Sequence, residues 1–379
     1  MRNDLSVEAK QTFQVVALLA TILVVGIHYQ SDVPNSPSPA DASWNELAQE
    51  FLFGGVARVA VPMFAFAAGF FYFRSDDGSF ATYRKKLKQR LRTVLFPFFI
   101  IASIAITSWL IARRVEGDPL EWTLGQFAAS WFLRPPAEQL WFLRDLMVLV
   151  TIAPAIRSIG QNSIGRKVLI AVLGLVWGLN WQVFPLIAGW HLLHMETLLF
   201  FVLGYAAVSH IDWIERVGRS PAKVFMAAWV LWCGLIFSRV CLRADFDIWY
   251  VTDYGWPDLL LHQVSVLVGC VALFMTAWRI RCDRLIQISG TAFFIYLVHE
   301  FPLRAVVDRV SDRFIDHSTS CWIVTPVVVI GCYAAALLFG RFFPALFGIV
   351  TGGRTPCSAA VIAYSSSNST TSSRPAHAS

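Results

Sequence analysis

Long apolar segments follow one another along almost the whole chain, and this pattern limits the folds that it can adopt. A helix that crosses the hydrocarbon core of a bilayer needs about 20 predominantly apolar residues. Ten segments approach or exceed that length: 12–28, 51–73, 94–112, 140–156, 167–182, 195–209, 222–240, 258–278, 286–306 and 322–346. The stretch 183–194 is an alternative re-entrant segment. The sequence therefore predicts an all-α, polytopic integral membrane protein with about ten transmembrane helices.

The composition agrees with a bilayer protein. Of the 379 residues, 56% are hydrophobic and only 15% are charged, and the mean hydropathy is +0.57. Ordinary soluble domains carry about 25% charged residues, so a water-soluble globular protein is excluded. The seven cysteines form no Cys-x-x-Cys pair and no His/Cys cluster at ligand spacing. Neither a disulfide framework nor a metal site is expected.

The net charge of +6 is distributed in a way that indicates membrane topology. Twenty Lys and Arg residues lie at the N-terminus, in the even-numbered connections and in the tail, whereas six lie in the odd-numbered connections. Lys and Arg are enriched in cytoplasmic loops. The count therefore predicts that both termini are cytoplasmic, with membrane lipid and not nucleic acid as the surrounding partner.

The chain is expected to form one membrane domain followed by a tail. Residues 1–346 contain all ten predicted spans, and residues 347–379 end in a Ser/Thr-rich stretch of low complexity. Such composition cannot bury enough apolar surface to fold. The tail is therefore predicted to be disordered and cytoplasmic.

Ionisable residues within the predicted spans gather in the outer half of the membrane. Each costs about 2.5–3.5 kcal/mol to insert, so their positions are informative. The group comprises His28, Arg58, Arg144, Asp145, His194, Glu196, His299, Glu300 and Arg304. Interfacial snorkelling or structural ion pairing is an alternative for the arginines and for His194. For His28 and His299 we favour a role as a base, because imidazole has a pKa of about 6.5.

A basic segment lies on the predicted cytoplasmic side, directly before the third span. It runs from Tyr83 to Arg92, and its candidate ligand-binding residues are Arg84, Lys86, Lys88, Arg90 and Arg92. One interpretation is an anchor for anionic lipid. The other is a clamp for a phosphate-rich cytoplasmic ligand such as coenzyme A, whose phosphates suit Arg and Lys.

Five motifs in order resemble those of acyltransferase family 3, the membrane O-acyltransferases of surface polysaccharides. They are His28 at the end of the first span, Val61–Phe70, the basic run leading to Phe96–Phe98, Leu140–Leu146 with Phe200–Tyr205, and Phe293–His299. The resemblance covers about residues 12–346. No single motif is specific, but their order on a ten-span chain is.

The resemblance implies an enzyme that transfers an acyl group, usually acetyl from acetyl-CoA, to a hydroxyl of a surface glycan across the bacterial inner membrane. Acyl-CoA would be the donor substrate, with no tightly bound cofactor. His28 matches the histidine regarded as catalytic, and would take the proton of the attacking hydroxyl. Asp145 or Glu300 would hold its imidazole, Arg144 would stabilise the oxyanion, and His299 is the alternative base. A histidine-bound acyl intermediate stays open.

One departure from the family pattern weakens the expectation. The family usually carries an arginine eleven residues before its histidine, assigned to handling the donor, and Ala17 stands there in this chain. Two other interpretations stay open. One is a transporter or flippase for an acylated sugar or lipid, since polar residues within spans also mark permeation paths. The other is an inactive membrane scaffold, which Ala17 favours.

Overall fold

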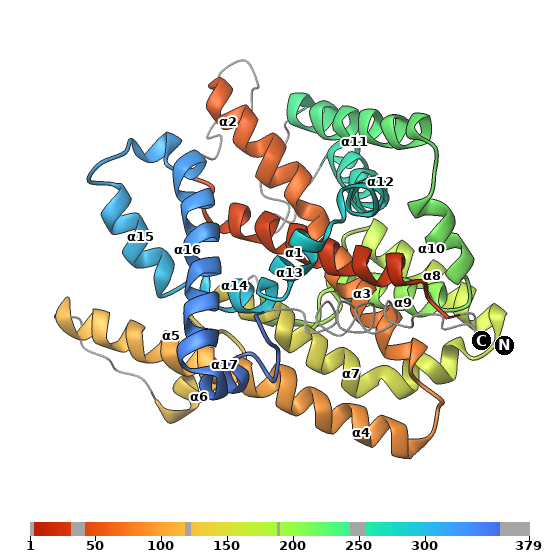
Figure 1. The fold of residues 1–379 in the computed structure, drawn as a ribbon, viewed down its shortest axis with the longest axis horizontal. Helices are drawn as coiled ribbons and strands as arrows, with labels where there is room; N and C mark the ends of the chain where they lie inside the picture. Colours follow the sequence, from red (N-terminus) through yellow and green to blue (C-terminus); the bar gives the residue numbers. More distant parts are fainter. Residues whose placement is uncertain (1–3, 32–41, 118–122, 188–189, 243–254, 357–379) are drawn as a thin grey trace, which may run out of the picture.

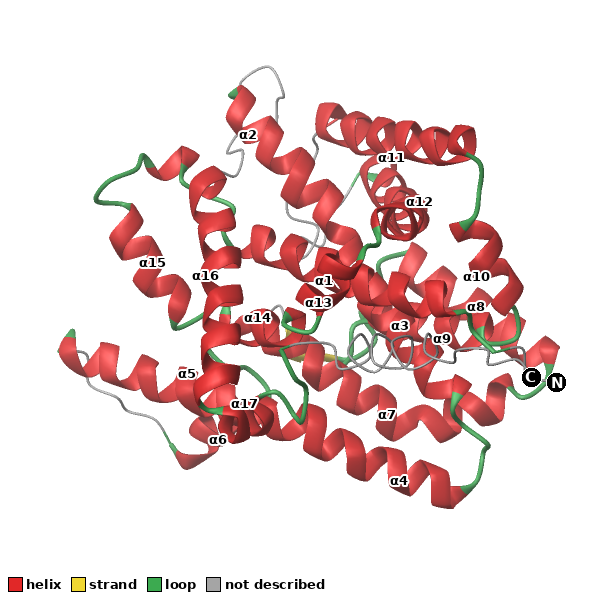
Figure 2. Cartoon of the chain, viewed as in Figure 1, coloured by secondary structure: helices red, strands yellow, loops and turns green. Residues whose placement is uncertain are grey.

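The computed structural model describes residues 4–31, 42–117, 123–187, 190–242 and 255–356. Regular structure in these ranges is almost entirely helical (Figure 2). The helices of the first half are α1 (Val7–His28), α2 (Trp44–Gln49), α3 (Ala60–Arg74), α4 (Phe80–Arg90), α5 (Phe96–Val115), α6 (Leu124–Phe132), α7 (Trp141–Gly160) and α8 (Ser163–Gly178). Those of the second half are α9 (Met195–Ala207), α10 (Ile211–Gly218), α11 (Ala222–Leu242), α12 (Trp256–Ile280), α13 (Asp283–Ser289), α14 (Ala292–Val298), α15 (Leu303–Ser311), α16 (Cys321–Phe342) and α17 (Pro344–Val350). The expectation of a helical membrane protein is confirmed.

The segment 183–194 holds the two strands of the described chain. Strand β1 (Pro185–Ile187) pairs antiparallel with β2 (Trp190–His191). This hairpin occupies the stretch for which a re-entrant segment was the alternative interpretation. It leads directly into α9 and so fixes the position of the residues that precede that helix.

Two long spans contain irregular helical turns. The helix α2 continues into α3 through a π-helical turn at Glu50–Gly55 and a 3-10 turn at Val56–Val59. The helix α4 continues into α5 through a π-helical turn at Leu91–Leu95. Each break re-aims the side chains that follow it, because it changes the rotation of the helix about its own axis.

The number of helices able to cross a membrane is smaller than the ten predicted. In the described ranges, seven helices are long and apolar enough to cross a membrane. An eighth span exists only if α9 and α10, which meet at an angle of 101°, count as one span. Predicted span five is α8, which has only 16 residues. Predicted span nine is divided into α13, α14 and α15. The count of ten is therefore not confirmed.

Helix α1 crosses the centre of the molecule (Figure 1) and packs against α3, α12, α13 and α14. Its N-terminus is capped by the side chain of Ser6, which accepts a hydrogen bond from the Ala9 amide. Apolar side chains of α1, including Phe13 and Val16, belong to the main hydrophobic core. The central position of α1 surrounds its C-terminal residue, His28, with other helices.

Close packing of α3 on α9 depends on two glycines. A Cβ added at Gly69 would lie 2.0 Å from the Phe201 carbonyl oxygen, and one at Gly204 would lie 2.2 Å from the Phe66 carbonyl oxygen. Small residues let helix backbones approach in membranes. Both glycines belong to the motifs that the sequence singled out, so those motifs have a packing role.

The end of the chain departs from the predicted boundary at residue 346. Helix α17 (Pro344–Val350) crosses that boundary, and the described chain continues as an ordered loop to Pro356. Gly352 has a φ of +66°, and its backbone lies against Thr93. Residues 347–356 of the predicted tail therefore pack on the membrane domain, and the rest of that tail, 357–379, lies outside the described residues.

Candidate active site

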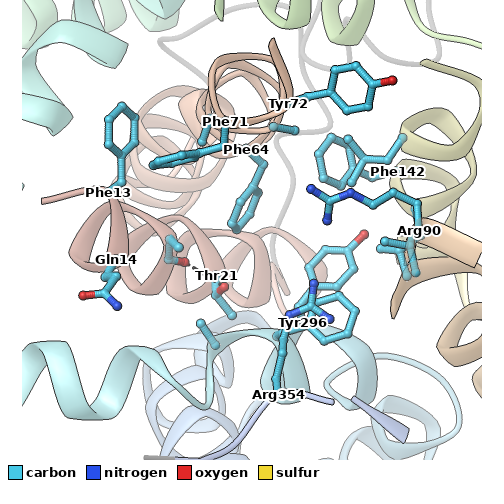
Figure 3. A pocket seen from close by; sticks show the side chains of 18 of the residues that line it. Phe13, Gln14, Thr21, Phe64, Phe71, Tyr72, Arg90, Phe142, Tyr296 and Arg354 are labelled. Carbon is cyan, nitrogen blue, oxygen red and sulfur yellow. Dashed lines mark hydrogen bonds between the residues drawn. The ribbon is translucent and has the colours of Figure 1, made fainter. Parts of the chain in front are cut away.

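A cavity of about 580 Å³ lies between α1, α3, α7, α14 and the loop after α17. Figure 3 shows its lining, in which aromatic side chains dominate. Its walls include Phe13, Phe64, Phe71, Phe142 and Tyr296. Ligand sites typically have about 300–1,000 Å³ and a mostly apolar lining. We call this space the central cavity.

Two arginines from distant parts of the sequence point into the central cavity (Figure 3). Arg90 comes from the end of α4, and Arg354 comes from the loop after α17. The Arg354 Nη1 donates to the carbonyl oxygens of Thr93 at 3.0 Å and Thr351 at 2.8 Å. Both side chains are half-buried. They form the cationic part of the cavity wall.

The other candidate residues of the basic segment do not line the central cavity in the described chain. Arg84, Lys88 and Arg92 are exposed. Lys86 lies 3.6 Å from the Asp76 carboxylate and donates to the Tyr72 carbonyl oxygen. The expected five-residue clamp is thus reduced to Arg90 at the cavity, and Lys86 holds α4 against the end of α3.

His28 and His299 lie side by side, with ring centroids 5.1 Å apart. His28 ends α1, and His299 follows α14. Neither ring is among the lining residues of the central cavity, but Tyr296 lines it, and the Tyr296 and His299 ring centroids are 6.1 Å apart. We call His28 and His299 the histidine pair. The pair is therefore next to Tyr296, whose ring forms part of the cavity wall.

The hydrogen bonds of His299 assign its tautomer. Its Nδ1 lies 3.2 Å from the Ile295 carbonyl oxygen and 3.0 Å from the Tyr296 carbonyl oxygen. A carbonyl only accepts, so Nδ1 carries the hydrogen and Nε2 carries the lone pair. The Nε2 atom is buried and has no hydrogen-bond partner among the described residues. His299 therefore presents a fixed, unoccupied basic nitrogen.

Backbone contacts hold the histidine pair in place. Tyr29 is the residue after His28, and its hydroxyl donates a hydrogen bond to the His299 carbonyl oxygen at 2.8 Å. The Gln139 side chain donates to the Leu297 carbonyl oxygen at 3.1 Å, and the Tyr296 hydroxyl donates to the Gln139 carbonyl oxygen. These bonds join the ends of α1 and α14 to the turn before α7. The sequence analysis missed Tyr29, Gln139 and Tyr296.

Asp145 and Arg144 belong to a separate group. The Asp145 Oδ2 accepts from the His194 amide at 2.9 Å and lies 3.0 Å from His194 Nδ1, while Oδ1 lies 3.5 Å from Arg144. Arg144 donates to the Leu133 carbonyl oxygen at 2.6 Å and to the His191 carbonyl oxygen. We call Arg144, Asp145, His191 and His194 the aspartate cluster. It ties α7 to the hairpin and to the start of α9.

The expected partnership of a carboxylate with His28 does not occur in the described chain. Asp145 is engaged by His194, and Glu300 accepts from the Phe301 amide and lies 3.9 Å from Arg304. The charged groups whose fields reach His28 are Arg58 and Arg304. The sequence grouped His28, Asp145 and Glu300 because their predicted depths in the membrane are similar. In the structure, the three side chains contact different neighbours. The expected roles of Asp145 and Arg144 beside His28 have no geometric support.

The position of the missing family arginine also belongs to the central cavity. Ala17 and Gln14 of α1 line the same cavity as Arg90 and Arg354. Arg354 was not a candidate in the sequence analysis. The one local signal for it is the Gly-Gly-Arg-Thr-Pro stretch at 352–356, which breaks the apolar run with a turn.

Two neighbouring imidazoles, one buried and one half-buried, lie beside an apolar cavity with two arginines in its wall, and the whole arrangement belongs to a helical membrane protein. Residues 16–341 match a family model described as an acyltransferase domain, and the chain belongs to this family, acyltransferase family 3. The resemblance seen in the motifs is thereby confirmed.

A curated relative extends almost over the full chain. It is the succinoglycan biosynthesis protein ExoH of Rhizobium meliloti (strain 1021), 26% identical over 373 residues, which are 93% of this chain and 94% of the relative. No solved structure matches the chain.

Proposed function

We propose that this protein transfers an acyl group, acetyl in the simplest case, from cytoplasmic acyl-CoA to a hydroxyl of a surface glycan at the bacterial inner membrane. The observation that carries the proposal is the central cavity, which joins a cationic wall at Arg90 to an aromatic wall beside the histidine pair. Membership of an acyltransferase family agrees with it. A relative named for succinoglycan biosynthesis favours a polysaccharide acceptor.

The donor would occupy the central cavity lengthwise. Its phosphates would lie at Arg90, because guanidinium groups bind phosphate oxygens through two parallel hydrogen bonds. Its pantetheine arm would follow the aromatic lining toward Tyr296. The thioester would then approach the histidine pair from the cavity, and the acceptor would approach it from the opposite membrane face.

His28 is proposed as the base. It takes the proton of the acceptor hydroxyl while the hydroxyl oxygen forms a bond to the thioester carbonyl carbon. The carbon–sulfur bond then breaks, and the proton passes from His28 to the departing thiolate, so that the products are an ester and free coenzyme A. General-base assistance of this kind contributes about 10²- to 10⁴-fold.

The neighbouring groups would support this step. The lone pair on His299 Nε2 can accept a hydrogen bond from the first imidazole and so orient it. The positive charges of Arg58 and Arg304 act on His28, and in this proposal they would also favour the developing oxyanion. The aspartate cluster would act at a distance, by holding α7 and α9.

A reconstitution assay tests the proposed reaction. Purified protein in proteoliposomes is given acetyl-CoA on one side and a hydroxyl-bearing polysaccharide on the other, and free thiol is measured together with the polysaccharide mass. Thiol release that requires the acceptor, with acetyl added to the polysaccharide, is expected. Transport of an already acylated sugar without thiol release would instead support the transporter alternative, and neither activity would support the scaffold.

The proposed orientation needs its own test. In a protein whose native cysteines are replaced, a cysteine is introduced at Lys88, which is exposed on α4. A membrane-impermeant thiol reagent added outside intact cells should fail to label it, and should label it after the cells are opened. Labelling in intact cells would invert the topology and exclude a cytoplasmic donor at Arg90.

A further inference from the structure

The loop after α17 is built around Arg354. Its guanidinium lies over the Phe293 ring, 3.7 Å from the ring centroid, and donates to the Thr93 and Thr351 carbonyl oxygens. The Thr351 hydroxyl in turn donates to the Arg354 carbonyl oxygen at 3.0 Å. The side chain is therefore fixed from three sides, and it points into the central cavity (Figure 3).

Within the described ranges, no acidic side chain forms an ion pair with Arg354. The described lining of the central cavity contains Arg90 and Arg354 but neither Asp nor Glu. Burial, followed by the nearby positive charge of Arg90, lowers the pKa of Arg354 to about 10. The two guanidiniums therefore add their positive charges to the wall of the same cavity.

Three other cationic side chains form ion pairs with carboxylates, unlike Arg354 and Arg90 in the described chain. Lys86 lies 3.6 Å from Asp76, and Arg157 bonds to the same carboxylate. Arg74 lies 3.1 Å from Asp4. Against this background, two half-buried arginines that share one cavity without a carboxylate form an excess of positive charge, and an anionic ligand would neutralise it.

We propose that Arg354 and Arg90 together bind the diphosphate of the acyl donor, so that the C-terminal loop completes the donor site. This inference rests on the proposed function, because it takes the donor to be a coenzyme A thioester. One arginine comes from the end of α4, and the other comes from the loop after α17, which already contacts Thr93 just beyond α4. The diphosphate would lie between the two guanidiniums and neutralise both charges.

Binding of coenzyme A to the full-length, detergent-purified protein tests the inference without any chemistry. The variants are Arg354→Gln and Arg90→Gln. The matched controls are Arg341→Gln and Arg92→Gln, which change exposed arginines near the same two elements but outside the cavity. Hydrogen bonds to charged groups contribute enough that each cavity variant should weaken binding about 10-fold or more, while each control stays near wild type.

A series of ligands identifies the group that Arg354 binds. Dephospho-coenzyme A keeps the diphosphate and should lose affinity with Arg354→Gln as coenzyme A does, whereas pantetheine carries no phosphate and should bind both proteins equally. Equal loss for pantetheine would mean that the loop only shapes the cavity, and the inference would be overturned. Arg354→Lys should restore part of the affinity for coenzyme A.

The outcomes separate this inference from the proposed function. If wild-type protein binds coenzyme A and the Arg354→Gln variant binds it equally well, Arg354 does not bind the diphosphate. In that case the inference is wrong, but coenzyme A remains the proposed donor. If wild-type protein does not bind coenzyme A at all, the proposed donor itself is wrong, and the inference fails with it.

Discussion

The histidine pair and the aspartate cluster are both polar groups among apolar helices, but their contacts differ. In the aspartate cluster, the Asp145 carboxylate contacts His194 twice and lies 3.5 Å from Arg144. In the histidine pair, His299 keeps a buried Nε2 with no hydrogen-bond partner in the described chain. The first group uses its polar atoms to connect helices. The second leaves the lone pair of His299 available to the neighbouring imidazole of His28, which we propose as the base.

This difference separates structure from chemistry among residues that the sequence could only group together. A buried polar group without a partner is destabilising, and His191 Nδ1 in the aspartate cluster is another such atom in the described chain. The two groups therefore differ chiefly in the buried Arg144–Asp145 contact, which the histidine pair lacks among the described residues. Removing either member of the buried Arg144–Asp145 pair would leave the other charge uncompensated, which is costly. The contrast predicts that variants in the aspartate cluster reduce stability first, whereas variants in the histidine pair reduce turnover first.

The largest loss of stability is expected for Asp145→Ala. Removing one partner of a buried ion pair leaves the Arg144 charge uncompensated, and such changes cost about 3–5 kcal/mol. Thermal unfolding of the detergent-purified protein measures the effect. Asp4→Ala serves as the control, because its ion pair with Arg74 is on the surface and should leave unfolding unchanged. An Asp145→Ala protein as stable as wild type would remove the distinction between the two groups.

A smaller loss is expected for His194→Ala. Asp145 then loses the contact with Nδ1 but keeps the His194 amide as a donor. An acceptor left partly unsatisfied costs about 1–3 kcal/mol, so unfolding should lie between wild type and Asp145→Ala. The double variant should be little worse than Asp145→Ala alone, since the two side chains share one interaction. Additive losses would show that His194 stabilises the fold through other contacts.

The smallest effect on stability is expected for Tyr29→Phe. The change removes one neutral hydrogen bond, from the Tyr29 hydroxyl to the His299 carbonyl oxygen, and should cost about 0.5–1.5 kcal/mol. Because that bond positions His299, kcat should fall while the KM for the donor stays constant. Tyr333→Phe, in the same small hydrophobic cluster, is the control and should change neither quantity. A rise in KM alone would place Tyr29 at the donor site instead.

Much of the helical pattern could be predicted from the sequence, and the failures have physical causes. Apolar segments such as 222–240 and 258–278 match α11 and α12 closely, because long uninterrupted runs leave little choice. The run 286–306 was read as one helix, but turns near Gly290 and Pro302 divide it into three. Hydropathy averages over such breaks.

The candidate site was predicted in part. His28 and His299 were both named, and the structure brings their rings together. Asp145, one of the two carboxylates predicted beside His28, contacts His194 instead. Membrane depth can be read from a sequence, but the direction in which a side chain faces cannot. Arg354 was missed since it follows all the predicted spans and reaches the cavity only through the fold of the C-terminal loop.

Single-turnover acyl transfer by His28→Ala in proteoliposomes, measured beside thermal unfolding and coenzyme A binding, tests the central claim most directly. The half-buried imidazole has no hydrogen-bond partner among the described residues, so its loss should leave unfolding and binding near wild type. Transfer should fall by at least about 10²-fold, as expected for a missing general base. A His28→Ala protein that transfers acyl groups at the wild-type rate would contradict the account, and a large loss in His299→Ala alone would assign the base to the other histidine.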